Sequence, residues 1–350
     1  NWKGINNLKL YELSLFSGIG ALEEGFKKVT DIEIVGYSEN NDYNGKVASK
    51  VYNLFHGTSD NDNLGPVQLV NKYKVSSDID ILTHGSPCQS FSIVNQQDEI
   101  KGGEKGSGTK SSLMWETVRI VEQIKPKVII WENVKAVLNK SNIEVFNEYL
   151  NTLRELGYTN FYEILNGVDF GIPQNRERIF VISIRNDIDS SKFKITKFRK
   201  KSNHLLHFLD DEIDESTIVP KDQYISWANK KGDFGNRLQV KDPSISYANT
   251  LVTKPGVGAV TNDFIPVELD IVKKEHPHIF KLRGRELAKE LLEQANGKIV
   301  LGSDVATAKE FSNDSEKNIR KVTEIPSDEL GMDIGPESIK EFKEIIKDAK

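Results

Sequence analysis

The sequence contains a single cysteine, Cys88, and the residues around it are those expected for a nucleophile. Cys88 follows a Gly-Ser-Pro turn after the apolar residues 80–83, and it precedes a polar, glycine-rich stretch at residues 101–108. A thiol at the carboxyl end of a strand, beside a segment that can close over it, is suited to attack an electrophilic carbon. A lone cysteine is more often a small buried hydrophobe, so the interpretation depends on which other residues converge on it.

Two other groups of polar residues follow or begin apolar segments and suit proton transfer or anion binding. Glu132 comes directly after the apolar residues 128–131, where its carboxylate either caps a helix or enters a site at the strand ends. Arg176 and Arg178 stand at positions i and i+2 at the start of another apolar strand. Their side chains are therefore expected on one face, where they hold a carboxylate or phosphate or form a surface ion-pair patch with Glu177.

A turn with two glycines, residues 16–20 (Phe-Ser-Gly-Ile-Gly), follows the largely alternating residues 8–15 and precedes a helical pattern. Glycines let the backbone approach a ligand closely and aim helix N–H groups at its anionic part. The spacing differs from the dinucleotide Gly-x-Gly-x-x-Gly pattern, so simple helix–sheet packing is an equal alternative. Glu39, near the end of the next strand, either accepts hydrogen bonds from two ribose hydroxyls or is an ordinary exposed carboxylate.

The elements that must position these residues alternate along the chain. Strands are predicted by apolar segments, and helices by longer periodic segments between them: strands at residues 8–15, 32–37, 80–83, 128–131, 162–165 and 178–184, and helices at residues 42–55, 112–124 and 146–156. This alternation predicts a doubly wound α/β fold with a mostly parallel sheet and ligands at the carboxyl ends of its strands. The alternation of strands and helices does not continue over residues 186–283, which predicts a smaller, loop-rich second domain.

Composition sets outer limits on function. The 350 residues carry a net charge of −5, so nucleic-acid affinity has to come from local patches, and no apolar run reaches the roughly 18 residues of a membrane span. The first residues show no export signal, which predicts a cytoplasmic location. Between Lys192 and Lys201, lysines and one arginine surround two phenylalanines. This run either follows a phosphate backbone or forms a solvated face.

In this order, the motifs resemble those of the DNA cytosine 5-methyltransferases, most closely over residues 8–185. Residues 16–20 resemble the family's first S-adenosylmethionine (SAM) motif, and residues 87–89 (Pro-Cys-Gln) resemble its nucleophile motif. Residues 132–134 resemble the Glu-Asn-Val motif, and residues 174–178 the Gln-x-Arg-x-Arg motif. The resemblance implies a Rossmann-like SAM-binding and catalytic domain at residues 1–185 and a target-recognition domain, incomplete here, at residues 186–283.

The resemblance also implies a reaction and a set of site residues. Cys88 would add to carbon 6 of cytosine, Glu132 would hold the ring at N3, and Arg178 with Arg176 would orient the base carbonyl, the phosphate or Glu132. The implied cofactor is SAM, without a metal, bound by Phe16, Gly18, Ile19, Gly20, Glu39, Pro87 and Leu113. The implied DNA contacts are Gln89, Ser90, Lys200, Lys201 and Thr250.

The implied substrate is a flipped cytosine in double-stranded DNA, as for a restriction-modification methyltransferase. The enzyme is expected to be a monomer with no obligate protein partner and no membrane association. Two alternatives stay open: a methyltransferase acting on carbon 5 of cytosine in tRNA, and a catalytically impaired protein that binds SAM or DNA. A comparison of transfer to duplex DNA and to tRNA separates the first alternative from the main prediction.

The sequence departs from the family pattern in two places. Residues 63–67 contain Pro66 where the family usually has a Gly-Asp-Ile-like turn whose Asp binds adenine. Residues 284–350 lack the family's closing motifs and resemble part of the C-terminal domain of phosphoglycerate kinase. This second resemblance predicts a chimera, natural or constructed, with a foreign α/β segment; the alternative is a divergent methyltransferase tail.

Overall fold

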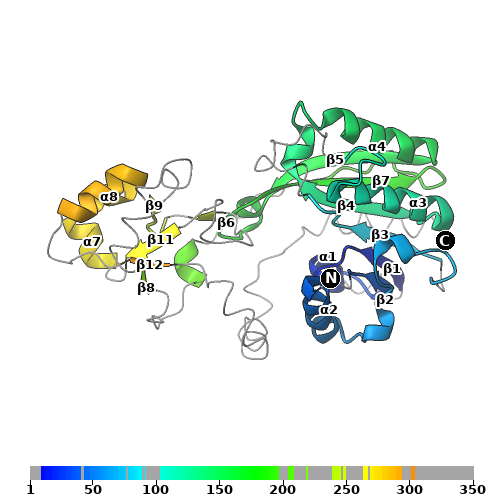
Figure 1. Ribbon diagram of the computed structural model, residues 1–350, viewed down its shortest axis with the longest axis horizontal. Helices are drawn as coiled ribbons and strands as arrows, with labels where there is room; N and C mark the ends of the chain where they lie inside the picture. Colours follow the sequence, from blue (N-terminus) through cyan, green and yellow to red (C-terminus); the bar gives the residue numbers. More distant parts are fainter. Residues whose placement is uncertain are drawn as a thin grey trace. The chain divides into compact units, whose positions relative to one another are not determined.

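The computed structural model describes the following residues, drawn in colour in Figure 1: 9–40, 43–75, 78–88, 91, 103–196, 204–208, 218–219, 239–245, 247–249, 263–266, 269–293 and 301–303. They form two compact units. The first contains the described residues up to 165 and residues 177–196, and the second contains residues 166–176 and the described residues from 204 to 303. The proposed domain boundaries at residues 185 and 283 stay predictions.

A six-stranded sheet forms the centre of the first unit, in the order β2-β1-β3-β4-β7-β5. Its strands are β1 (Leu10–Leu15), β2 (Ile32–Ser38), β3 (Ile81–His84), β4 (Val128–Val134), β5 (Tyr158–Asn166) and β7 (Glu177–Arg185). The pairs β1–β2, β1–β3 and β3–β4 are parallel, and β7 is antiparallel to β4. The predicted doubly wound, mostly parallel α/β sheet is confirmed.

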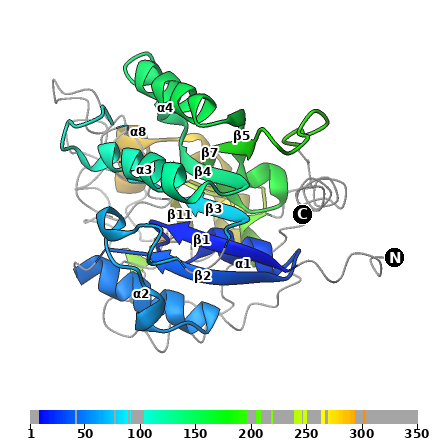
Figure 2. The same ribbon diagram turned by 90° about the vertical axis from the view of Figure 1, so that its right-hand side faces the viewer.

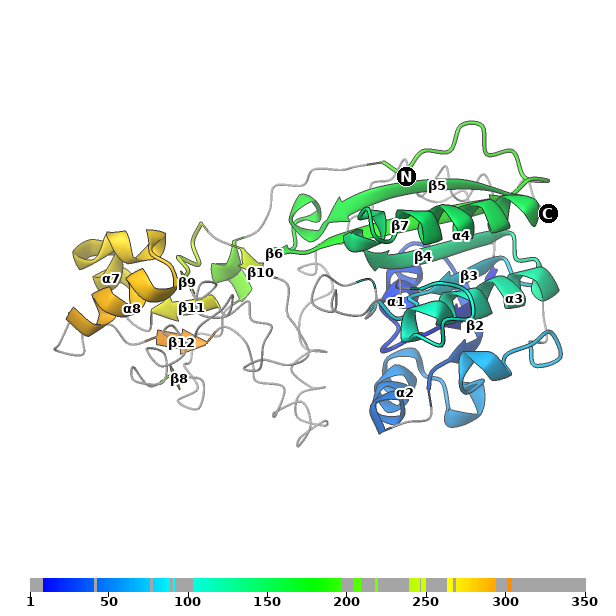
Figure 3. The ribbon, with the colours of Figure 1, turned by 45° about the horizontal axis from the view of Figure 1, so that its top comes forward.

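One face of this sheet is covered by α3 (Met114–Ile124) and α4 (Ile143–Glu155), which lie along the same side of the strands in Figures 2 and 3. Their apolar stripes pack on the side chains of β1, β3, β4 and β7 that point to that face. Aromatic rings dominate the middle of this layer, where Trp131 lies 4.7 Å from Tyr149 between ring centroids. Burial of these large rings fixes β4, the strand that carries Glu132.

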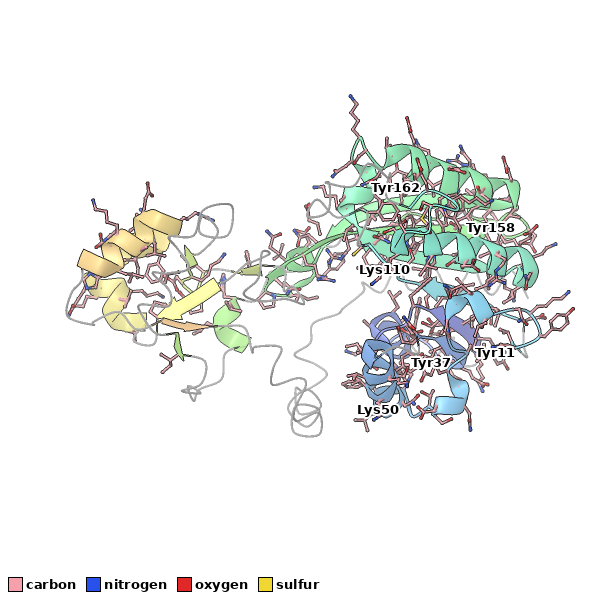
Figure 4. The ribbon with its side chains drawn as sticks, in the orientation of Figure 1. Tyr11, Tyr37, Lys50, Lys110, Tyr158 and Tyr162 are labelled. Carbon is pink, nitrogen blue, oxygen red and sulfur yellow. The ribbon has the colours of Figure 1, made fainter. Side chains whose placement is uncertain are left out.

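The opposite face is covered by α1 (Ala21–Lys27) and contacted by α2 (Tyr43–His56). Phe26 of α1 packs on a second apolar cluster formed by alternate residues of β1, β3, β4 and β7. Tyr37, labelled in Figure 4, stacks on Tyr52 of α2 with ring centroids 4.0 Å apart. Because helices cover both faces, the strands are buried on both sides, and so are some of their polar residues, such as Glu12 and Thr83.

The second unit contains a four-stranded sheet in the order β8-β12-β11-β9. Its elements are β8 (Ile218–Val219), β9 (Gln239–Val240), β11 (Asp263–Pro266), β12 (Leu301–Ser303), α7 (Leu269–Glu275) and α8 (Gly284–Glu293). A two-stranded pair joins β6 (Gln174–Asn175) to β10 (Ala248–Asn249). In α8, Leu287, Ala288 and Leu291 are buried, so this helix packs by one face.

Short 3-10 helices connect the elements, at Asp60–Asp62, Val67–Leu69, Lys110–Leu113, Lys135–Leu138, Gly167–Phe170, Leu205–Phe208 and Pro277–Lys281. Among the described residues, no helix is long and apolar enough to cross a membrane.

Candidate active site

The strand order changes direction between β1 and β3, so a topological switch point lies at the carboxyl ends of these two strands. The chain passes from β1 to β2 on one side and then returns to β3 on the other side of β1. Such a reversal leaves the connections at the strand ends pointing apart, and ligands bind there in open α/β sheets. Residues 16–20 leave the end of β1 and resemble the family's first SAM motif. Residues 85–88 leave the end of β3 and include Cys88.

The turn at residues 16–20 has the backbone of a ligand-binding loop. Phe16, Gly18 and Gly20 have positive φ values of 55°, 56° and 83°. The N–H of Ser17 donates to the carbonyl of Ser38 at 3.2 Å, which ties the turn to the end of β2. A Cβ placed on Gly18 would meet no atom within 4 Å, so the backbone there borders open space.

Gly20 is closed on its other side by the ring of His56. A Cβ on Gly20 would come within 2.0 Å of His56 Nε2. That nitrogen lies 3.3 Å from the carbonyl of Ile19, and the other ring nitrogen lies 2.9 Å from Lys27 Nζ. Since an ammonium only donates, Nδ1 accepts and Nε2–H donates to Ile19. Burial, followed by the charge of Lys27, lowers the pKa of His56, so a neutral ring supports the turn.

Glu39 comes directly after β2, and its carboxylate lies against the same turn. Its Oε2 accepts a hydrogen bond from the N–H of Gly18 at 2.8 Å, and its Oε1 accepts from the N–H of Asn40 at 2.9 Å. The Glu39 backbone N–H donates to Asn63 Oδ1 at 3.1 Å. The structure therefore brings Gly18 and Glu39, two of the predicted cofactor residues, into direct contact.

Asn63 is a residue that sequence reasoning did not assign, and it holds the turn that contains Pro66. Besides Glu39, its Oδ1 accepts from the N–H of Gly65 at 2.9 Å, and its Nδ2 donates to Ser49 at 3.0 Å. An Asn side chain that accepts from the backbone N–H two residues later forms an Asx-turn. The Asn-x-Gly sequence at residues 63–65 was the feature from which this turn could have been predicted. This turn therefore contacts the backbone of Glu39.

Two carboxyl groups in β1 and α1, the elements that flank residues 16–20, were also not assigned from the sequence. Glu12 in β1 and Glu23 in α1 are 0% and 1% exposed. Glu12 Oε1 accepts from Thr83 at 2.9 Å, and Glu23 Oε1 accepts from Tyr52 at 3.1 Å. Burial, and then the neighbouring Glu23, raises the pKa of Glu12 well above its usual value. Both causes favour the protonated form of Glu12, which lets two acidic side chains share this interior.

Cys88 lies in the turn after β3 and is half-buried. Its carbonyl accepts from the N–H of Phe91 at 3.0 Å. Two residues earlier, Ser86 accepts hydrogen bonds from Trp131 Nε1 and, through its carbonyl, from Asn133 Nδ2, both at 3.0 Å. The turn that carries the cysteine is thus attached to the neighbouring strand β4.

Glu132 lies on that same strand. The sequence placed it after the end of a strand, but β4 continues to Val134 because these residues pair with β7. Glu132 therefore does not cap a helix. Its Oε1 forms an ion pair with Arg178 Nε at 3.0 Å, and its Oε2 lies 3.9 Å from the position of a Cβ on Gly85. This places the carboxylate beside the turn that leads to Cys88.

The two predicted arginines do not share a strand. Arg176 precedes the first residue of β7, and its N–H donates to Asn166 Oδ1 at 3.1 Å. Its carbonyl accepts from Gly167, so this backbone bonds to the adjacent loop instead of to β4. The Glu177 carboxylate forms an ion pair with Lys135 at 3.0 Å, and the Glu177 carbonyl accepts a hydrogen bond from Arg178 Nη1 at 2.7 Å. Arg178, which lies within β7, forms an ion pair with Glu132.

The remaining predicted residues fall into two groups. Pro87 and Leu113 are half-buried, Leu113 ending the 3-10 helix before α3, and Ile19 is 54% exposed. The residues predicted to contact DNA lie outside the described residues: Gln89, Ser90, Lys200, Lys201 and Thr250. Within the part of the chain that is described, no group of three or more His, Cys, Asp or Glu residues is arranged to hold a metal ion.

Comparison with known proteins identifies the family. The model of the C-5 cytosine-specific DNA methylases matches residues 11–324. The chain belongs to this family. It is 41% identical over 144 residues to the type II methyltransferase M2.ScrFI of Lactococcus lactis subsp. cremoris, covering 41% of this chain and 39% of that protein. It is 35% identical over 212 residues to M.HhaI of Haemophilus parahaemolyticus, covering 60% of each. These matches thus span less than two thirds of either relative.

Solved structures support the fold. The crystal structure of a triple mutant of Spodoptera frugiperda DNMT2 matches with a TM-score of 0.60 at 18% identity, covering 84% of this chain and 85% of that one. The S. pombe Dnmt2 methyltransferase matches with a TM-score of 0.58 at 16% identity, covering 97% and 94%. The fold is therefore the Rossmann-like fold of these methyltransferases.

The predicted chimera is not borne out. The match to the methylase family continues through residue 324, well past the proposed junction at residue 284. In the second unit, β12 pairs antiparallel with both β11 and β8. A strand from beyond the proposed junction thus lies between two strands from before it, which is the arrangement of one continuous sheet. The kinase-like residues are part of the family match as far as it extends.

Proposed function

We propose that this protein transfers a methyl group from SAM to carbon 5 of a flipped cytosine in double-stranded DNA, through a covalent adduct on Cys88. The observation that carries the proposal is the position of Glu132, paired with Arg178 and next to Gly85 of the turn that leads to Cys88. Addition to a pyrimidine ring requires a nucleophile and a proton donor close together, and Cys88 follows β3 while Glu132 lies on the adjacent strand β4. Membership of the family and its type II methyltransferase relatives favour the same reaction.

Each residue has a defined part in the proposed reaction. The Cys88 thiolate adds to carbon 6, and Glu132 protonates or hydrogen-bonds N3, so the charge that develops on the ring is neutralised. Carbon 5 is thereby made nucleophilic. After methyl transfer a base removes the proton from carbon 5, the bond between Cys88 and carbon 6 breaks, and the free thiolate returns. The cytosine must leave the duplex stack first, at a cost of a few kcal/mol.

SAM supplies the electrophilic methyl group when it is bound, and the residues at the β1 and β2 ends suit it. The backbone of Gly18 borders open space, and the Glu39 carboxylate beside it accepts hydrogen bonds. A carboxylate in that place suits the two hydroxyls of a ribose. We propose Phe16, Gly18, Ile19, Gly20, Glu39, Pro87 and Leu113 as the cofactor residues, with Arg178 orienting Glu132.

Intact-protein mass spectrometry tests the proposal. The protein is incubated with SAM and duplex oligonucleotides that carry 5-fluorocytosine in varied contexts. Fluorine cannot leave as a proton does, so a working enzyme stays bound to its substrate. We expect an adduct that maps to Cys88, requires SAM and disappears in Cys88→Ala. Folded protein without an adduct on DNA would overturn the proposal.

The same experiment addresses the finer predictions. A tRNA carrying 5-fluorocytosine forms a second arm, and an adduct on tRNA alone would establish the RNA alternative. The oligonucleotides trapped from the pool give the recognised sequence, which restriction-modification methyltransferases read in duplex DNA. The monomeric state, the lack of an obligate partner and the cytoplasmic location stay predictions of the sequence; size-exclusion chromatography tests the first.

A further inference from the structure

Ser86 is almost fully buried and is held by two side chains of β4. It is 3% exposed, and its partners Trp131 and Asn133 are 1% and 2% exposed. Trp131 Nε1 donates to Ser86 Oγ at 3.0 Å, while Asn133 Nδ2 lies 3.0 Å from the Ser86 carbonyl and 3.5 Å from Oγ. A buried N–H group without an acceptor lowers the stability of the fold. The two donors therefore favour the one position of Ser86 in which both hydrogen bonds form.

The two donors are themselves fixed by packing. The Trp131 ring lies parallel to the His84 ring, at 3° with centroids 5.7 Å apart, and His84 bonds to the Tyr149 hydroxyl at 2.9 Å. Asn133 Oδ1 accepts from the N–H of Val134 at 2.8 Å, which orients the amide so that Nδ2 faces Ser86. Ser86 is therefore attached to a rigid aromatic layer and not to a flexible surface.

Strand β4 also contacts the turn from its other face. Trp131 and Asn133 are two residues apart on β4 and point to one side of the sheet, and Glu132 points to the other. On that side Glu132 Oε2 lies 3.9 Å from a Cβ position on Gly85. The turn that carries Cys88 is thus held on one face by the two neighbours of Glu132 while it meets Glu132 itself on the other.

We propose that Ser86 is a positioning residue that sets the Cys88 thiol relative to the Glu132 carboxylate. The inference rests on the proposed methyl transfer and deepens it. Pro87 stands between Ser86 and Cys88 and fixes its own φ, so few backbone rotations separate the anchor from the nucleophile. Loss of the Ser86 hydroxyl removes the acceptor for Trp131 Nε1 and lets the turn shift. A displacement of about 1 Å at a reacting group is enough to slow a reaction about 100-fold.

The single cysteine of the chain allows a test that does not depend on activity. Alkylation by iodoacetamide reports on Cys88 alone. In Ser86→Ala, the released turn exposes the half-buried thiol, and we expect alkylation to be faster by about threefold or more. Tyr149→Phe is the matched control, because it removes a buried hydroxyl from the same layer without touching Ser86. We expect it to lower thermal stability and to leave alkylation at the wild-type rate.

The single-turnover rate of trapping by 5-fluorocytosine DNA gives the second readout. We expect Ser86→Ala and Trp131→Phe each to slow trapping about 10- to 100-fold, with SAM affinity within about twofold of wild type. Because both remove one hydrogen bond, the double variant should be little slower than either alone. A merely structural Ser86 would instead lower SAM affinity and stability together.

Two outcomes separate this inference from the proposed function. If the wild-type protein forms no adduct, the proposed function fails, and the alkylation rates still decide whether Ser86 positions Cys88. If the wild-type protein is trapped and Ser86→Ala is alkylated and trapped at wild-type rates, the positioning role is overturned while the methyltransferase proposal stands.

Discussion

Glu132 and Arg178 form an ion pair across the antiparallel strands β4 and β7, with Nε 3.0 Å from Oε1. The two side chains keep 28% and 18% of their surface exposed, so the pair lies at the border of the site and not in the core. The pairing involves one carboxylate oxygen, and the other lies on the side of Gly85. Arg178 therefore fixes the rotation of Glu132 toward the turn that carries Cys88.

Replacing Arg178 with Met should slow methyl transfer. The carboxylate loses its orienting partner, and we expect the turnover number to fall about 10²- to 10³-fold with SAM affinity unchanged. Steady-state kinetics and calorimetric titration with SAM measure the two quantities. Lys135→Met is the control, since it breaks the neighbouring, more exposed pair with Glu177 and should leave turnover unaltered. A wild-type turnover number in Arg178→Met would show that Arg178 is not needed to orient Glu132.

The buried His84 should make stability fall in acid. Burial lowers the pKa of His84 to about 3, against about 6.5 in the unfolded chain. Below pH 6.5 the unfolded chain therefore binds a proton that the folded protein does not bind until about pH 3. This favours unfolding by about 1.4 kcal/mol per pH unit in that window.

Denaturant unfolding at about pH 7.5 and pH 5.5 measures the contribution of His84 to the pH dependence of the free energy of unfolding. The loss of stability between the two should be smaller in His84→Gln by about 1.4 kcal/mol. An equal pH dependence in His84→Gln and wild type would contradict the assignment.

Gly20 should be intolerant of a side chain because of His56. Alanine at Gly20 has to adopt a φ of +83° and overlaps the imidazole ring, whereas alanine at Gly18 has only the unfavourable φ. We expect Gly20→Ala to cost about 1–3 kcal/mol more stability than Gly18→Ala, measured by denaturant unfolding. Adding His56→Ala to Gly20→Ala should recover most of that difference. If both glycine variants lose the same stability, the His56 contact does not constrain the turn.

The lysines at 200 and 201 give a prediction about DNA affinity. Replacing both with Ala should weaken duplex binding and flatten the dependence of log affinity on log salt, by about 1 for each phosphate whose charge is no longer neutralised. Fluorescence anisotropy over a range of salt concentrations measures the slope. Lys46 and Lys50 on the exposed face of α2 provide the control pair. If the salt dependence of the Lys200 and Lys201 variant equals that of the control variant, residues 192–201 form a solvated surface and do not contact DNA.

Much of the first unit could be predicted from periodicity, because each strand and helix is long enough to show its pattern. The error at β4 is instructive. Its apolar run ends at Trp131, but the strand continues through Val134 since β7 supplies its hydrogen bonds. A pairing between residues so far apart in sequence leaves no local trace, so the true strand end was not predictable. The contact of Glu132 with Arg178 was one of three partners that the family resemblance implied for Arg178, and the structure shows it.

Buried polar residues were missed for a related reason. Glu12 sits at a polar position of an alternating segment, which usually indicates a solvated face. Helix α1 covers that face instead, and Glu12 is buried beside Thr83. Ser86 gave even less indication, because a serine in a turn is common. The burial of these residues depends on which helices and strands pack against them. That packing is known only when the complete fold is known.

The register between β3 and β4 has a consequence for how such chains can diverge. His84 lies opposite Trp131, so the turn with Cys88 and the carboxylate of Glu132 are aligned by lateral hydrogen bonds between adjacent strands. The long excursion through α3 that joins them in sequence does not set their spacing. Changes of length in the connection from α3 to β4, at the opposite ends of these strands, are therefore compatible with an unchanged spacing between Cys88 and Glu132.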